Sequence, residues 1–196
     1  YKRQKQGHAH AQYNLAICYN DGNGIQKNVK KALEWYEQAA NQGHSEAQFN
    51  LAICYKCGKG VQKNVKKGAE WFEQAAHQGH ANAQYNLGVC YKVGDGVAQD
   101  LKKAVEWYEQ AAKQGHAHAQ YSLGFCYKDG DGVPQDEKKV AYWFKQAAKQ
   151  GNAGAQNNLG ACYYHGEGVG KDFKKAAQWY EKAAKQCNPE AQNSMG

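Results

Sequence analysis

With 196 residues, of which 42% are hydrophobic and 22% are charged, the sequence has room for one domain or a short array of repeats. No apolar run approaches the roughly 18 residues that a membrane-spanning helix needs, so we expect no membrane insertion. The net charge of +7 is spread thinly along the chain and Arg3 is the only arginine, which argues against nucleic acid as the partner.

The sequence repeats with a period of 36 residues, and residues 80–115 are the clearest copy. Tryptophan recurs in register at Trp35, Trp71, Trp107, Trp143 and Trp179. A fixed period in this range predicts stacked supersecondary units that bury a core only together. We expect a fragment of a longer array, divided into a leader or the end of a preceding helix at 1–7, repeats at 8–43, 44–79, 80–115, 116–151 and 152–187, and the start of a truncated sixth repeat at 188–196.

Each repeat predicts two helices, which we call helix A and helix B. In the clearest copy, Ala83, Leu87 and Tyr91 fall on one apolar face of helix A. A glycine such as Gly94 suits the left-handed position that ends this helix. Asp100 and its counterparts are Asn or Asp, whose side chains cap helix N-termini, so helix B begins there.

The repeated motif resembles the Sel1-like repeat, a relative of the tetratricopeptide repeat. The resemblance is carried by Ala81-Asn82-Ala83, Leu87-Gly88, Tyr91, Gly94-Asp95-Gly96-Val97, Lys103-Ala104, Trp107-Tyr108 and Ala111-Ala112. It covers nearly the whole chain and implies an all-α fold, a right-handed α-solenoid of antiparallel helix pairs with a concave groove. Members of this family mostly serve as non-catalytic scaffolds and adaptors.

One cysteine per repeat recurs on the apolar face of helix A, at Cys18, Cys54, Cys90, Cys126 and Cys162. Equivalent positions of packed helices lie about 8–10 Å apart, beyond the roughly 7 Å that a disulfide spans, so we expect free, buried thiols. Unpaired thiols favour a cytoplasmic location, although a secreted or periplasmic one stays open because the native N-terminus is absent. Cys54 and Cys57 have the spacing of a redox motif, but no βαβ pattern surrounds them.

No pattern of catalytic or metal-binding residues emerges from the repeat. His8, His44, His80 and His116 each start a helix A, and copies one repeat apart do not converge on one zinc ion. The repeated Gly-x-Gly lacks a preceding strand, so it predicts a structural turn rather than a phosphate loop. We therefore expect no catalytic residue, no metal and no cofactor, and a protein that is not an enzyme.

In a tetratricopeptide-like register, three ladders of helix A positions line the concave groove. The groove residues that we predict are, in an aromatic ladder, Tyr13, Phe49, Tyr85 and Tyr121; in an aliphatic ladder, Ile17, Ile53, Val89 and Phe125; and in a polar ladder, Asn20, Lys56, Lys92, Lys128 and Tyr164. Aromatic and aliphatic side chains rimmed by lysine suit a peptide that carries acidic residues. The alternative is that the aromatic ladder packs between adjacent A helices.

These features predict a scaffold that binds protein or peptide segments in its groove. Two alternatives stay open: a lysine-rich surface that binds nucleic acid or another polyanion, and self-association through uncapped repeat ends.

Overall fold

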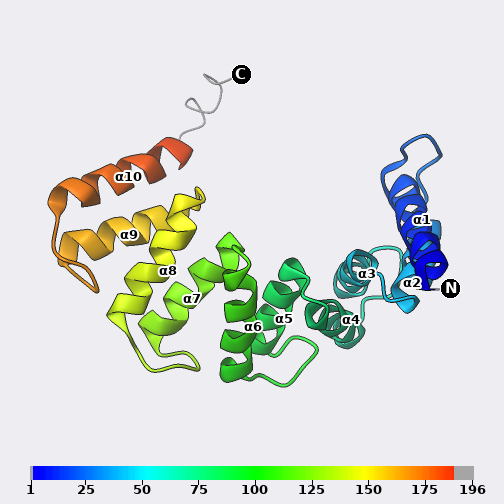
Figure 1. Ribbon diagram of the computed structural model, residues 1–196, viewed down its shortest axis with the longest axis horizontal. Coiled ribbons are helices and arrows are strands. Elements are labelled where there is room, and N and C mark those ends of the chain that lie inside the picture. The colour runs from blue at the N-terminus through cyan, green and yellow to red at the C-terminus, as the bar shows by residue number, and fades with distance from the viewer. Residues whose placement is uncertain (1, 188–196) are drawn as a thin grey trace. The chain divides into compact units, whose positions relative to one another are not determined.

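The structure is a computed structural model that describes residues 2–187 and the side chains of residues 8–186. This part of the chain is all-α and contains no strand, as predicted (Figure 1). Its ten helices are α1 (Lys2–Asp21), α2 (Val29–Asn41), α3 (Ser45–Cys57), α4 (Val65–His77), α5 (Ala81–Val93), α6 (Leu101–Lys113), α7 (Ala117–Asp129), α8 (Glu137–Lys149), α9 (Ala153–His165) and α10 (Phe173–Cys187). The predicted start of a sixth repeat, 188–196, lies outside the described residues.

Odd-numbered helices are the predicted A helices and even-numbered ones are the B helices. The helix A stop is confirmed, because Gly58 and Gly94 adopt the left-handed conformation directly after α3 and α5. The helix B start is confirmed as well: Asn28 Oδ1 accepts from the Lys31 amide at 3.0 Å. Helix α1 differs from the other A helices because it begins at Lys2 and includes the residues expected to form a leader.

The chain forms two compact units, Tyr1–Asp100 and Leu101–Gly196, which we call unit 1 and unit 2. In unit 1, α1 packs with α2, α2 with α3, α3 with α4, and α4 with α5. Unit 2 repeats this pattern from α6 to α10. Within each unit, every helix therefore packs against its neighbours in sequence, and the boundary between the units falls between the two helices of the third repeat.

Small residues of the A helices let the B helices approach closely. A Cβ added at Gly124 would overlap the ring of Phe144, and one added at Gly160 would lie 2.8 Å from the ring of Tyr180. The gain in packing explains why glycine is tolerated inside these helices despite its low helix propensity.

A buried glutamine recurs in every repeat and, from the second repeat onward, joins it to the preceding one. The series is Gln12, Gln48, Gln84, Gln120 and Gln156, and these are the buried polar residues of the described chain. Gln48 Nε2 donates to the Ala40 carbonyl at the end of α2 at 3.1 Å, while its Oε1 accepts from Gln78 Nε2 at 2.6 Å. Because both ends of the amide are paired, the cost of burying this polar side chain is offset. This series was not predicted from the sequence.

The cysteine series consists of free thiols, as predicted. Cys54, Cys90, Cys126 and Cys162 are buried. Cys18 is only half-buried, which corrects the expectation for the first repeat: α1 packs mainly with α2, whereas α3, α7 and α9 each lie between two B helices. The side chain of Cys187 lies outside the described residues.

Candidate partner-binding surface

The structure places every predicted groove residue on an A helix, partly or fully exposed to solvent. Unit 1 carries Tyr13, Ile17, Asn20, Phe49, Ile53, Lys56, Tyr85, Val89 and Lys92, all half-buried; unit 2 carries Tyr121 and Phe125, which are half-buried, and Lys128 and Tyr164, which are exposed. The buried leucines, such as Leu51 and Leu87, lie on the same helices. Each A helix therefore buries one face and presents the ladder positions on another.

The aromatic ladder of unit 1 packs between successive A helices, in agreement with the alternative kept open above. The Tyr13 ring stacks on the His44 imidazole with centroids 4.6 Å apart, and the Phe49 ring stacks on His80 at 4.7 Å. Phe49 also lies 5.8 Å from the Phe72 ring of α4. The rings are thus fixed by their neighbours while part of their surface stays open to solvent.

The imidazoles below these rings cap the A helices. The Ala47 amide donates to His44 Nδ1 at 3.3 Å, and the Ala83 amide donates to His80 Nδ1 at 3.1 Å. An Nδ1 atom that accepts must be unprotonated, so the ring proton of the neutral imidazole sits on Nε2. His44 Nε2 therefore donates to His10 Nδ1 at 3.3 Å and has no lone pair for a metal ion.

Charged groups of the polar ladder already have partners within the chain. Lys56 Nζ lies 3.6 Å from an Asp95 carboxylate oxygen and 6.0 Å from the centroid of the Phe72 ring. Lys128 Nζ lies 6.0 Å from the Phe125 ring centroid. An acidic partner would therefore compete with Asp95 at the first lysine, which weakens that contact relative to an unpaired cation.

Unit 2 carries two aromatic clusters on its predicted groove positions. Tyr121, Phe125 and the buried Phe144 form a three-ring cluster with centroids 5.0–5.8 Å apart. Tyr164 and Phe173 meet edge to face at 5.2 Å, and they are 47% and 58% exposed. These exposed rings are specific to the fifth repeat, because the other repeats carry Asn or Lys at the position of Tyr164.

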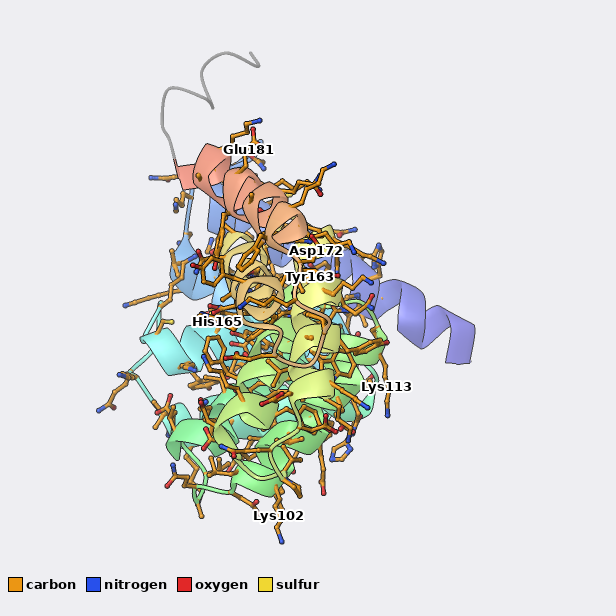
Figure 2. All side chains as sticks on the ribbon, turned by 90° about the vertical axis from the view of Figure 1, so that its left-hand side faces the viewer. Lys102, Lys113, Tyr163, His165, Asp172 and Glu181 are labelled. Atoms are coloured by element: carbon orange, nitrogen blue, oxygen red, sulfur yellow. The ribbon has the colours of Figure 1, made fainter. Side chains whose placement is uncertain are left out.

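In the fifth repeat, a lysine of helix B contacts Tyr163, the tyrosine that follows Cys162 of the cysteine series. Lys175 Nζ lies 5.5 Å from the Tyr163 ring centroid and 3.0 Å from Asp172 Oδ2. Tyr163 and Asp172 are labelled in Figure 2. The hydrogen bond from the Lys175 amide, followed by the bond and charge of its ammonium group, lowers the pKa of Asp172. The same side of the second repeat pairs Lys67 with Tyr55. These contacts join helix A to helix B, and none of them involves a ladder position.

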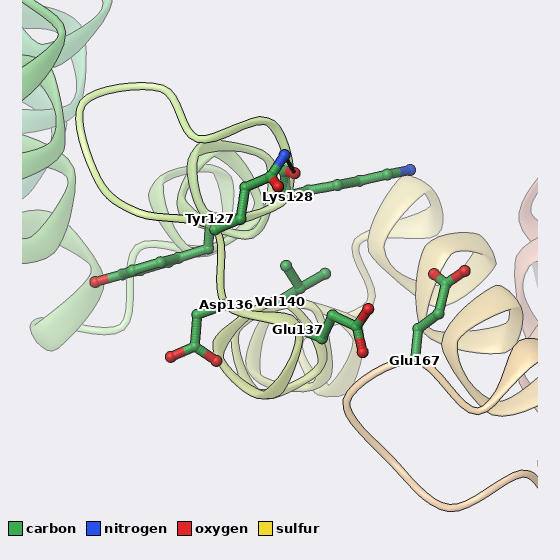
Figure 3. Close-up of a pocket in the computed structure, with 7 residues that line it drawn as sticks. Tyr127, Lys128, Asp136, Glu137, Val140 and Glu167 are labelled. Carbon is green, nitrogen blue, oxygen red and sulfur yellow. Dashed lines mark hydrogen bonds between the residues drawn. The ribbon is translucent and has the colours of Figure 1, made fainter.

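A cleft of about 410 Å³ lies in unit 2 beside the polar ladder (Figure 3). It is lined by Tyr127, Lys128, Gln135, Asp136, Glu137, Val140 and Glu167. Asp136 Oδ1 accepts from the Lys139 amide as the cap of α8, and Tyr127 Oη donates to Glu109. One lining residue, Asp136, is thus a helix cap, and Lys128 is the predicted groove residue within the cleft.

A second cleft, of about 520 Å³, lies in unit 1 at the N-terminal ends of the A helices. It is lined by Ala9, His10, Tyr13, Gln42, Gly43, His44, Ser45, Glu46 and Gln78. Of these, sequence reasoning singled out Tyr13 for the groove. The recurrence of His44 in four of the five repeats and of Gln78 in all five was the available signal for the others, but a single sequence does not show which recurrent polar residues meet in space.

The thiols of the buried series are poor nucleophiles. Burial raises the pKa values of Cys54 and Cys90, and burial with the nearby Glu167 carboxylate raises that of Cys162 to about 11. A thiol must ionise to attack or to bind a metal ion, so these environments suppress such chemistry. Within residues 2–187, no group of three or more His, Cys, Asp or Glu is arranged to hold a metal ion.

Comparison with known proteins gives the same architecture. The model of the Sel1 repeat matches residues 9–44, 45–80, 81–116, 117–152 and 153–186. No curated protein matches the chain. Within the described part, no helix is both long and apolar enough to cross a membrane.

Two solved structures are similar over nearly the whole chain. A protective antigen of uropathogenic Escherichia coli with the same repeat fold is 36% identical with a TM-score of 0.90, over 95% of this chain and 40% of that protein. A Sel1 repeat protein from Oxalobacter formigenes is 34% identical with a TM-score of 0.88, over 97% of this chain and 78% of that one. Cysteine-rich protein B of Helicobacter pylori is 26% identical over 68% of this chain, with a TM-score of 0.52.

Proposed function

Because this chain belongs to the Sel1 repeat family, whose members are generally non-catalytic protein-interaction scaffolds, we propose that it binds a protein segment on the ladder face of its A helices. The family assignment carries the general role of protein binding. The ladder face, as the place where a partner docks, is our own assignment.

The observation that carries this assignment is the half-exposed aromatic ladder. Phe49 and Tyr121 are each fixed from one side by a neighbouring ring, at 4.7 Å and 5.8 Å, and open to solvent on another. A ring that is already immobilised loses little conformational entropy when a partner packs on it. Tyrosine is also enriched among residues that dominate binding energy.

The chemistry of the ladders favours a peptide with apolar side chains and some acidic residues. In unit 1, Ile53 and Val89 provide aliphatic surface on the A helices. In unit 2, Lys128 provides an exposed cation 6.0 Å from the Phe125 ring centroid. The lysine contacts are secondary, because Lys56 is already paired with Asp95. The apolar positions therefore supply most of the affinity, and the lysines select against basic partners.

Removing two ladder rings should abolish partner capture. We expect the double variant Tyr85→Ala and Tyr121→Ala to retain its helicity by circular dichroism but to capture no partner from an extract of the source organism. Tyr142→Ala is the matched control, since this tyrosine is 53% exposed on α8 and lies outside the ladders. Lys128→Glu, at an exposed position, tests the same face without deleting a ring.

Undiminished capture by the folded double variant would reject the ladder face as the docking site. Capture that disappears when the extract is treated with nuclease would instead favour the polyanion alternative, since nucleic acid would then be the captured molecule.

A further inference from the structure

Four A helices begin with a side-chain cap of the same geometry but of two chemical kinds. His44, His80 and His116 cap α3, α5 and α7 with φ between −73° and −67° and ψ between 106° and 109°. Asn152 caps α9 at φ −65° and ψ 108°, and its Oδ1 accepts from the Ala155 amide at 2.8 Å. The backbone is thus the same at all four starts, whereas the acceptor is an imidazole nitrogen in three and an amide oxygen in one.

The two kinds of cap differ in their response to acid. Protonation of an imidazole puts hydrogen on Nδ1, which removes the acceptor and adds a positive charge at the positive end of the helix dipole. Both effects oppose the capped state. An asparagine oxygen does not titrate, so the cap of α9 is the same at pH 5 and at pH 7.5.

The surroundings of His44 reinforce the preference for the neutral ring. Helix α1 contributes His10, 3.3 Å away, and the stacked Tyr13 ring. Helix α3 contributes Glu46, and the end of α2 contributes the Ala39 carbonyl, which accepts from the His44 amide. Burial and the His10 imidazole lower the pKa of His44, and the Glu46 carboxylate opposes them.

His80 has a different set of neighbours. Its Nε2 lies 3.2 Å from a Glu46 oxygen of α3, close enough for an ion pair but not aligned as a hydrogen bond. Phe49 of α3 stacks on the ring, and His77 lies in the last turn of α4 before it.

We propose that the histidine caps make the starts of α3 and α5 acid-sensitive, so that these two helix ends open as the pH falls below about 6.5, while α9 stays closed. For His44, the sign follows from its lowered pKa: the folded state binds fewer protons than the unfolded state near pH 6.5, so stability is lost as the pH falls through that value. The inference concerns the fold and does not depend on the proposed partner-binding face.

Amide hydrogen exchange of the whole chain, followed by NMR, tests this directly. The Ala47 and Ala83 amides donate to His44 and His80, and the Ala155 amide donates to Asn152. After correction for intrinsic exchange, we expect protection at Ala47 and Ala83 to fall about 2- to 30-fold between pH 7.5 and pH 5.0, the range that loss of an N-cap produces. Protection at Ala155 should not change.

Exchanging the caps makes the test reciprocal. His44→Asn with His80→Asn should abolish the fall at Ala47 and Ala83, and Asn152→His should create one at Ala155. The matching backbone of Asn152 indicates that asparagine fits these positions. Equal protection at Ala47 and Ala83 at the two pH values would overturn the proposal, as would a fall that persists in the double asparagine variant.

Discussion

At the scale of single residues, polar groups in the core define how repeats join. Gln48 is 3% exposed and is hydrogen bonded at both ends of its amide, to the repeat before it and to the end of its own helix B. A buried amide is costly unless it is paired, so its position relative to both helices is restricted. Apolar contacts tolerate sliding, whereas these hydrogen bonds specify one register.

Replacing this glutamine should therefore destabilise the chain. We expect Gln48→Leu to lower the free energy of unfolding by about 1–3 kcal/mol, because it removes the hydrogen bond to the Ala40 carbonyl and deprives Gln78 Nε2 of its acceptor on Gln48. Urea denaturation measures the difference. Gln26→Leu, in an exposed loop, should change stability by less than about 0.5 kcal/mol. Equal midpoints for the two variants would show that Gln48 does not join the repeats.

The residue scale is also where sequence reasoning failed. Glutamine is normally a surface residue, so a hydropathy pattern places Gln48 outside the core. Its recurrence every 36 residues on the face of Ala47 and Leu51 was a usable signal, but one that does not distinguish a hydrogen-bonding role from an inherited surface residue. The stacking of Tyr13 on His44 was beyond sequence analysis, because it depends on how far one A helix lies from the next.

At the scale of elements, the loop after helix A docks on the preceding repeat from the second repeat onward. A Cβ added at Gly96 would overlap the carbonyl of Val65 at the start of α4, and the same close approach recurs in later repeats. Gly24 has the same left-handed backbone, with φ +75°, but nothing lies within 4 Å of its missing Cβ. Gly24 therefore requires glycine only for its left-handed backbone, whereas Gly96 requires it both for its left-handed backbone and for the close approach to Val65.

Alanine at these two positions should thus have unequal effects. Gly24→Ala incurs only the strain of a left-handed alanine, about 1–2 kcal/mol. Gly96→Ala incurs the same strain and must also push the loop away from Val65, so we expect the larger loss of thermal stability. Differential scanning calorimetry of both variants gives the comparison. If Gly24→Ala is the more destabilised, the loop does not dock as described.

The elements themselves were predictable from local patterns. Asn or Asp at the start of helix B and glycine at the end of helix A have local physical roles, so the helix limits follow from the residues present. Asn64, for example, caps α4 through the Lys67 amide at 2.9 Å. The extension of α1 back to Lys2 is the exception, because the paired alanines of the other repeats are absent there.

At the scale of the whole molecule, one repeat unit determines the architecture and its copies differ at the surface. Positions such as Ala83 and Leu87 are fully buried in each described repeat from the second onward, so they determine packing. Ladder positions vary in size and charge from copy to copy, as Lys128 and Tyr164 illustrate. The repeat period and the hydropathy pattern predict the buried positions. Which partner the ladder positions recognise depends also on the partner molecule, which is outside the chain.

The central claim, that a protein partner docks on the ladder face, is tested most directly by site-specific photocrosslinking. A benzoylphenylalanine at position 85 or 121 should crosslink a protein partner in an extract of the source organism, while the same group at position 142, exposed on α8, should not. Tyrosine is the native residue at all three positions, so the substitutions are matched in size. Crosslinks from position 142, with none from positions 85 and 121, would contradict the account.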